Sequence, residues 1–254
     1  MIDFHTHTPA WRTSSWLGGA TFDAADFLAF MDGAGIERAV VLSHDGLFNP
    51  SPRANDELAA FVAADPDRLV GFGTVSPRHE DAPREAARMM DELGLRGMKL
   101  HPWLQGFSLQ ERTLDPICEV LVERGGTLLC HDGTPPYSTP AQIAALARRH
   151  PGLPVVLGHG GLHDCWREAL EACRQTPNLY LCICGTPPYA ARHIVQHGPA
   201  DRILFGTDAG LSDQAEQHYA VARVAEIDGW GISADQRRAM LVDNPRRLLE
   251  GAAR

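Results

Sequence analysis

The chain has few of the features that mark membrane, secreted or nucleic-acid-binding proteins. No apolar run approaches the roughly 18 residues of a membrane span, and no basic region with a signal core precedes the first apolar run at Ile2. The six cysteines show no CxxC spacing, so we expect reduced thiols in a cytoplasmic protein. The formal net charge of −9 argues against a nucleic-acid or anionic-membrane partner, because both need clustered basic residues.

What remains is an ordinary soluble composition, with 44% hydrophobic and 22% charged residues. The 254 residues contain no linker, repeat or low-complexity stretch, which predicts a single domain over residues 1–254. This length fits one (β/α)₈ barrel, a fold of roughly 250 residues.

Short β-branched or apolar runs alternate with longer helical patterns along the chain. The candidate strands are residues 2–7, 39–43, 69–74, 97–101, 127–131, 155–159, 178–184 and 203–208. The candidate helices are residues 24–35, 55–65, 83–93, 115–125, 140–150, 164–175, 190–197, 212–226, 234–243 and 245–249.

Helix-start residues support this alternation. Asn55, Thr139 and Ser233 are good N-cap types, and Pro83 and Pro140 suit a first helical turn. Eight strands alternating with helices predict a parallel sheet that closes into a TIM barrel. An open doubly wound sheet is the alternative, and it accounts less well for ligand residues that come from nearly every part of the chain.

Five residues of metal-ligand type stand at the ends of the apolar runs. They are His5, His7, His131, His159 and Asp208. The carboxyl ends of barrel strands meet on one face, so these side chains should share one pocket. His5 and His7 lie two apart in a strand and therefore leave the same face. Imidazole and carboxylate suit one or two Zn²⁺ ions best, with Mn²⁺, Fe²⁺ and Co²⁺ as alternatives.

Lys99 and His101 also share the face of one candidate strand. Three interpretations of Lys99 stay open: a solvent-facing residue at the barrel mouth, a binder of a substrate carboxylate, or a carbamate that bridges two metals. His101 is a candidate for substrate contact or for support of the metal ligands.

An ordered set of motifs resembles the amidohydrolase superfamily over nearly the whole chain. The motifs are DFHTH at 3–7, NDEL at 55–58, PDRLVGFG at 66–73, GMKLHP at 97–102, HDG at 131–133, GHGG at 158–161, FGTD at 205–208 and DNPRRLL at 243–249. The resemblance is greatest to the amidohydrolase-2 branch related to aminocarboxymuconate-semialdehyde decarboxylase.

This resemblance implies roles for the candidate residues. His5, His7 and Asp208 would bind the first metal. In one-metal relatives His131 completes that site and His159 orients or activates a water. In two-metal relatives the position of Lys99 bridges the metals, and the two later histidines hold the second ion.

The seventh candidate strand departs from the family pattern. Many relatives carry an Asp-Thr-Ser-like end, whereas this chain has LCICG at residues 181–185. Cys182 and Cys184 share a face, so one or both would line the barrel. Core thiols and thiolate ligation of a metal are both open.

The predicted function is metal-dependent hydrolysis of a small ester, lactone or amide. Water on the metal would have its pKa lowered towards about 7, and Asp208 would take its proton. Non-oxidative decarboxylation of an unsaturated or aromatic acid is the alternative, with His159 protonating the carbon; a hydratase is a third possibility. A metal-binding barrel without catalysis is the rival from another class.

The expected partner is a small-molecule substrate, with a homo-oligomer as an open possibility. Loops after the strands should set specificity, because they surround the pocket. Arg12, Arg53 and Lys99 are the candidate cations for a substrate carboxylate, and Trp103 is a candidate aromatic contact.

Overall fold

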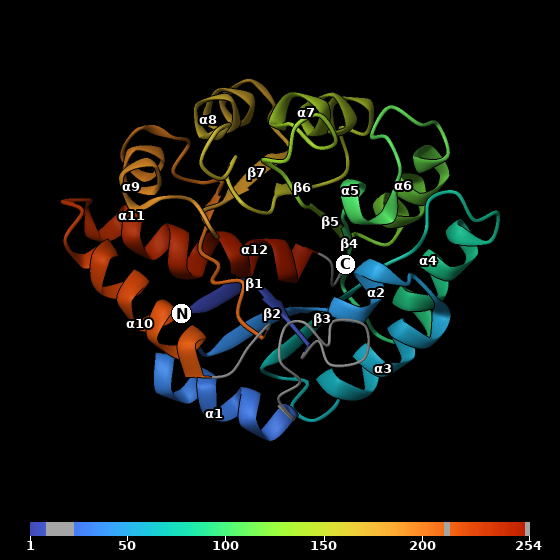
Figure 1. The fold of residues 1–254 in the computed structure, drawn as a ribbon, viewed down its shortest axis with the longest axis horizontal. Coiled ribbons are helices and arrows are strands. Elements are labelled where there is room, and N and C mark those ends of the chain that lie inside the picture. The colour runs from blue at the N-terminus through green and yellow to red at the C-terminus, as the bar shows by residue number, and fades with distance from the viewer. Residues whose placement is uncertain (9–22, 211–213, 252–254) are drawn as a thin grey trace.

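The computed structural model describes residues 1–8, 23–210 and 214–251, and within them the chain forms a barrel of eight parallel strands (Figure 1). The strands follow one another around the sheet in chain order. They are β1 (Ile2–His7), β2 (Arg38–Leu42), β3 (Leu69–Gly73), β4 (Gly97–Leu100), β5 (Thr127–Cys130), β6 (Val155–Leu157), β7 (Leu179–Cys182) and β8 (Ile203–Leu204).

Helices surround the strands in Figure 1. They are α1 (Ala24–Ala34), α2 (His44–Phe48), α3 (Pro52–Val62), α4 (Ala82–Asp91), α5 (Pro102–Gln105), α6 (Leu114–Glu123), α7 (Pro140–Arg149), α8 (Trp166–Gln175), α9 (Pro188–His197), α10 (Gln214–Asp228), α11 (Ala234–Arg238), the π-helical turn η2 (Ala239–Asp243) and α12 (Asn244–Gly251). None of the described helices is long and apolar enough to cross a membrane.

Alternation along each strand divides the buried residues into two cores. In β2, Ala39 and Val41 join the outer core between strands and helices, whereas Val40 and Leu42 fill the barrel interior. Leu248 and Leu249 of α12 belong to the interior core with Ile2, so α12 packs at the amino-terminal end of β1. The barrel is therefore filled with side chains below the opposite, carboxyl-terminal face.

The segment after β8 connects back to β1. Phe4 N–H donates to the carbonyl of Phe205 at 2.9 Å, and Asp208 N–H donates to the carbonyl of His5 at 2.8 Å. These backbone bonds fix the carboxyl end of the last strand against the first.

The predicted barrel and all eight strands are confirmed, and most element boundaries differ by a few residues. Asn55 was wrong as an N-cap: α3 begins earlier, and Ser51 accepts from Ala54 N–H at its start. Two short helices, α2 and α5, lie in segments where no helix was predicted. Both follow directly after strands, capped by the side chains of Ser43 and His101.

Candidate metal centre

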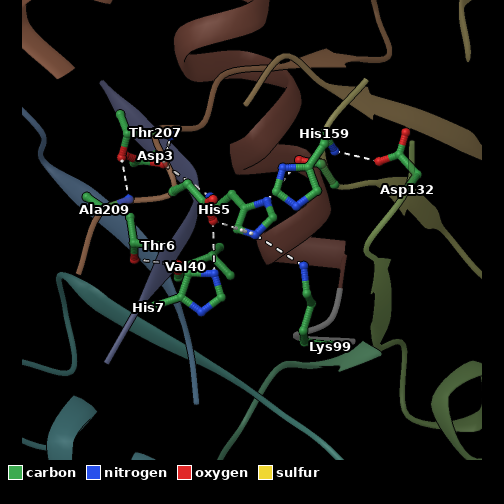
Figure 2. A network of polar contacts seen from close by, with 12 residues as sticks. Asp3, His5, Thr6, His7, Val40, Lys99, Asp132, His159, Thr207 and Ala209 are labelled. Atoms are coloured by element: carbon green, nitrogen blue, oxygen red, sulfur yellow. Dashed lines mark hydrogen bonds and ion pairs between the residues drawn. The ribbon is translucent and has the colours of Figure 1, made fainter. Parts of the chain in front are cut away.

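The centre begins with the two histidines of β1. The register of β1 against β2 shifts between Asp3 and Thr6, which marks an irregularity beside His5. His5 and His7 are both buried, and their rings lie 5.3 Å apart between centroids. Both imidazoles therefore face one point at the carboxyl end of the strand, as the spacing predicted (Figure 2).

Asp208 lies at the point that both imidazoles face. Its Oδ1 lies 3.0 Å from His7 Nε2 and 3.3 Å from His5 Nε2. Asp208 has φ of 64°, in the left-handed region that non-glycine residues rarely adopt. Such strain is typical of functional sites, and the bond from Asp208 N–H to His5 holds the residue there.

Hydrogen bonds also fix the orientation of the His5 ring. Its Nδ1 lies 2.8 Å from the carbonyl oxygen of Gly158, so this nitrogen carries the proton and donates it. Nε2 then presents a lone pair, with Lys99 Nζ at 3.1 Å on one side and Asp208 on the other. A backbone contact of this kind is a common support for a metal-binding histidine.

Asp3 supports the centre without entering it. Its carboxylate accepts from His5 N–H at 3.1 Å, from Thr207 N–H at 3.2 Å and from Thr207 Oγ1 at 2.6 Å. Burial raises the pKa of Asp3 to about 7, although these hydrogen bonds lower it. The contacts tie β1 to the residue that precedes Asp208.

His159 approaches from the segment after β6. Its ring centroid lies 4.6 Å from that of His5, and its N–H donates to Asp132 at 2.5 Å. Asp132 also accepts from Gly161 N–H at 2.6 Å, which fixes the turn that follows His159. A side chain at Gly161 would lie 2.4 Å from the backbone of Cys165, so this turn requires glycine.

His131 and His101 extend the cluster. The His131 centroid lies 4.4 Å from that of His159, and the rings of His101 and His131 stack 3.8 Å apart at 11°. His131 Nε2 contacts Thr134 Oγ1 at 2.7 Å. All six predicted metal-site residues, together with His101, therefore form one contiguous group.

Burial lowers the pKa of most imidazoles in this group, including those of His5, His101 and His131. It lowers the pKa of His159 to about 4 and also lowers the pKa of Lys99, with nearby charges as smaller causes. Burial would raise the pKa of Asp208, but His5 and the hydrogen bond from His7 hold it well below its usual range. A carboxylate among buried imidazole nitrogens is a suitable environment for a cation.

The donor atoms fit a metal ion. Ligand atoms of His5, His159, Cys184 and Asp208 all lie within 4.8 Å of one another. Nδ1 of His7 is buried without a hydrogen-bond partner, which is costly unless something else binds there. Nitrogen, oxygen and sulfur donors together suit a divalent transition metal.

Of three further predicted substrate contacts, one stands apart from the cluster, one lies beside it and one falls outside the described residues. Arg53 stands in the first turn of α3, where it pairs with Glu57 at 2.9 Å and has 73% of its side chain exposed. Trp103, 52% exposed in α5, lies 6.2 Å from His101 between ring centroids. Arg12 lies outside the described residues.

Sequence reasoning missed two supporting residues, Asp132 and Thr134. Asp132 follows His131 in the HDG motif, and Thr134 comes two residues later, so proximity to a ligand was the available signal. Their hydrogen bonds reach the backbone of His159 and the ring of His131, and such contacts follow from the folded turns rather than from residue spacing.

A parallel barrel with buried histidines and an aspartate at its carboxyl-terminal face defines the class of metal-dependent barrel enzymes. The Amidohydro_2 model, described as amidohydrolase, matches residues 2–251. The chain therefore belongs to the amidohydrolase family.

Known proteins resemble the chain to different extents. A 2-amino-3-carboxymuconate-6-semialdehyde decarboxylase of Dictyostelium discoideum is 28% identical over 130 residues, which cover 42% of this chain and 36% of that protein's length. An uncharacterised TIM-barrel protein of Bordetella bronchiseptica matches with a TM-score of 0.75 at 23% identity, covering 100% and 99% of the two chains.

A 5-carboxyvanillate decarboxylase of Novosphingobium aromaticivorans, solved with manganese and a nitrobenzoic acid, also matches with a TM-score of 0.75. It is 20% identical, and the match covers 98% of this chain and 95% of that one. At these identities the structural matches establish the shared fold.

Proposed function

We propose that the protein is a metal-dependent, non-oxidative decarboxylase of a small unsaturated or aromatic carboxylic acid. The sequence predicted hydrolysis first and decarboxylation second. The named relatives with known activities are decarboxylases, and they support the second reading better than the first.

His5, His7 and Asp208 would hold the metal, because both Nε2 atoms already converge on one carboxylate oxygen. A divalent ion bound there would act as a Lewis acid towards a substrate oxygen. Manganese accompanies one structural relative, and the donor types here also suit zinc.

The observation that carries the proposal is the position of Lys99. It is the chain's only lysine, 1% exposed, with Nζ 3.1 Å from His5 Nε2. Burial lowers its pKa, and a substrate carboxylate placed beside it would favour its charged form. Lys99 would thus bind and orient the carboxylate in a buried part of the site.

His159 would supply the proton. When the bond between the carbon and its carboxylate breaks, carbon dioxide leaves and the electron pair stays on the carbon, which then needs a proton. Burial lowers the pKa of His159 to about 4, so its imidazolium is a strong acid once a bound substrate anion favours its formation. His131 and His101, stacked beside it, would line the substrate pocket.

A panel of hydroxylated benzoates and muconate-like acids tests the proposal. The purified protein is stripped of metal, reloaded with Mn²⁺ or Zn²⁺, and assayed for released carbon dioxide. The expected result is release from a subset of the acids in the loaded protein only. Turnover of esters, lactones or amides without carbon dioxide would instead support hydrolysis.

A further inference from the structure

We propose that the Cys184 thiol is a further ligand of the metal beside His5 and Asp208, so that the centre binds through nitrogen, oxygen and sulfur. The inference rests on the metal centre of the proposed function. It adds a sulfur donor from the segment that follows β7. It also gives the centre a chemical preference that histidine and aspartate alone would not confer.

The position of Cys184 carries the inference. Its sulfur belongs to the group of four donor atoms that lie within 4.8 Å of one another, with His5, His159 and Asp208. Cys184 is fully buried and belongs to the interior core, two residues beyond the end of β7. Cys184 thus lies near the carboxyl-terminal face of the barrel, where the candidate ligands from the other strands also lie.

The surroundings keep this position open for a ligand. A Cβ at Gly206 would lie 2.9 Å from His5 Cβ and 3.2 Å from Cys184 Cβ, so the glycine lets these two side chains approach. A Cβ at Gly185 would lie 3.5 Å from His159 Nδ1, so the absence of a side chain there leaves room beside the imidazole.

Cys182, the last residue of β7, provides the contrast. It is equally buried and faces the same interior core, but it is absent from the four-atom group. Its sulfur would lie 2.6 Å from a Cβ at Gly206, so it packs against Gly206 inside the barrel. Cys182 is therefore a packing thiol and a matched control for Cys184.

Ligation would exchange one bond for another without any redox step. The sulfur–hydrogen bond breaks, the proton leaves to solvent, and the sulfur electron pair binds the metal. Thiolate is a soft ligand, so the centre should prefer Zn²⁺ or Co²⁺ to Mn²⁺ more strongly than one with nitrogen and oxygen donors alone.

Cobalt spectroscopy tests the inference independently of catalysis. The wild-type protein, Cys184→Ser and Cys182→Ser are loaded with Co²⁺, and near-ultraviolet absorption is recorded beside metal content. Wild type and Cys182→Ser should show an intense sulfur-to-cobalt charge-transfer band, which Cys184→Ser should lack. Zn²⁺ affinity should fall by roughly 10-fold or more in Cys184→Ser, with a much smaller change for Mn²⁺.

The outcomes separate this inference from the proposed function. A loaded wild-type protein without a sulfur band overturns the ligation whatever the variants do, and so does a band that persists in Cys184→Ser. A sulfur band in a protein that releases no carbon dioxide from any acid supports ligation and contradicts decarboxylation. A wild-type protein that binds none of the three metals contradicts both.

Discussion

At the scale of single residues, the sequence located the donors better than it assigned their roles. The spacing of His5 and His7 predicted their shared face because strand alternation is a strong geometric rule. Lys99 had three open interpretations, and its burial removes the solvent-facing one. The contribution of Cys184 depends on distances across the barrel, which residue types alone do not determine.

Replacing Lys99 tests its role in binding the carboxylate. Lys99→Met keeps the apolar stem and removes the amino group, so kcat/KM should fall by about 10-fold to 100-fold, mainly through a higher KM. Arg124→Met is a suitable control, because Arg124 pairs with Asp91 just before β5, away from the carboxyl-terminal face.

Metal content measured on the same Lys99→Met protein decides between the two remaining interpretations of Lys99. One ion per chain in both wild type and variant agrees with carboxylate binding. Two ions in wild type that fall to one or none in the variant would instead indicate a carbamate bridge.

Replacing His159 tests the proton donor. His159→Gln should lower kcat by about 10²-fold to 10⁴-fold, the usual contribution of a positioned acid, while one metal ion remains bound. His197→Gln, on the exposed face of α9, should leave kcat unchanged. Full turnover by His159→Gln would remove this residue from the mechanism.

At the scale of the elements, the alternation of apolar runs and helical patterns predicted the strands because both periodicities were clear. The helices α2 and α5 were missed because each is short, and their caps, Ser43 and His101, were assigned to the ends of candidate strands. Asn55 was taken for a cap because its residue type suits that position. In the structure the side-chain amide of Asn55 instead forms buried hydrogen bonds.

Asn55 joins three elements by hydrogen bonds. Its Nδ2 donates to the carbonyl of Thr74 at 3.0 Å and to Glu85 at 2.7 Å, and its Oδ1 accepts from Thr74 N–H at 2.9 Å. Asn55→Ala would leave a buried backbone group unpaired, so the free energy of unfolding should fall by roughly 1–3 kcal/mol.

Urea unfolding of Asn55→Ala beside Asn49→Ala measures this effect. Asn49 is exposed at the end of α2, so its replacement should change the free energy of unfolding by less than about 0.5 kcal/mol. Equal stability of both variants and wild type would show that the Asn55 contacts contribute little.

At the scale of the whole molecule, the barrel brings together donors that lie more than two hundred positions apart in the sequence, as His5 and Asp208 do. The fold class was predictable because eight alternating units and the family motifs agree. The reaction was less predictable, since one centre of histidines and aspartate can serve hydrolysis or carbon–carbon cleavage.

Metal binding should stabilise the whole barrel, because its donors come from both ends of the chain. At about 100 times the dissociation constant, an ion that binds only the folded state adds roughly 2.7 kcal/mol. Chelation should therefore lower the Tm by roughly 5–10 °C, and added Zn²⁺ or Mn²⁺ should restore it. An unchanged Tm in calorimetry would argue against a bound metal.

The most direct test of decarboxylation follows one atom through the reaction. The metal-loaded protein is incubated in D₂O with an acid from which it releases carbon dioxide, and the product is examined by NMR. Decarboxylation should place one deuteron on the carbon that lost the carboxylate, in step with carbon dioxide release. Consumption of the acid with no deuteron on that carbon, and with water added to the product instead, would contradict decarboxylation.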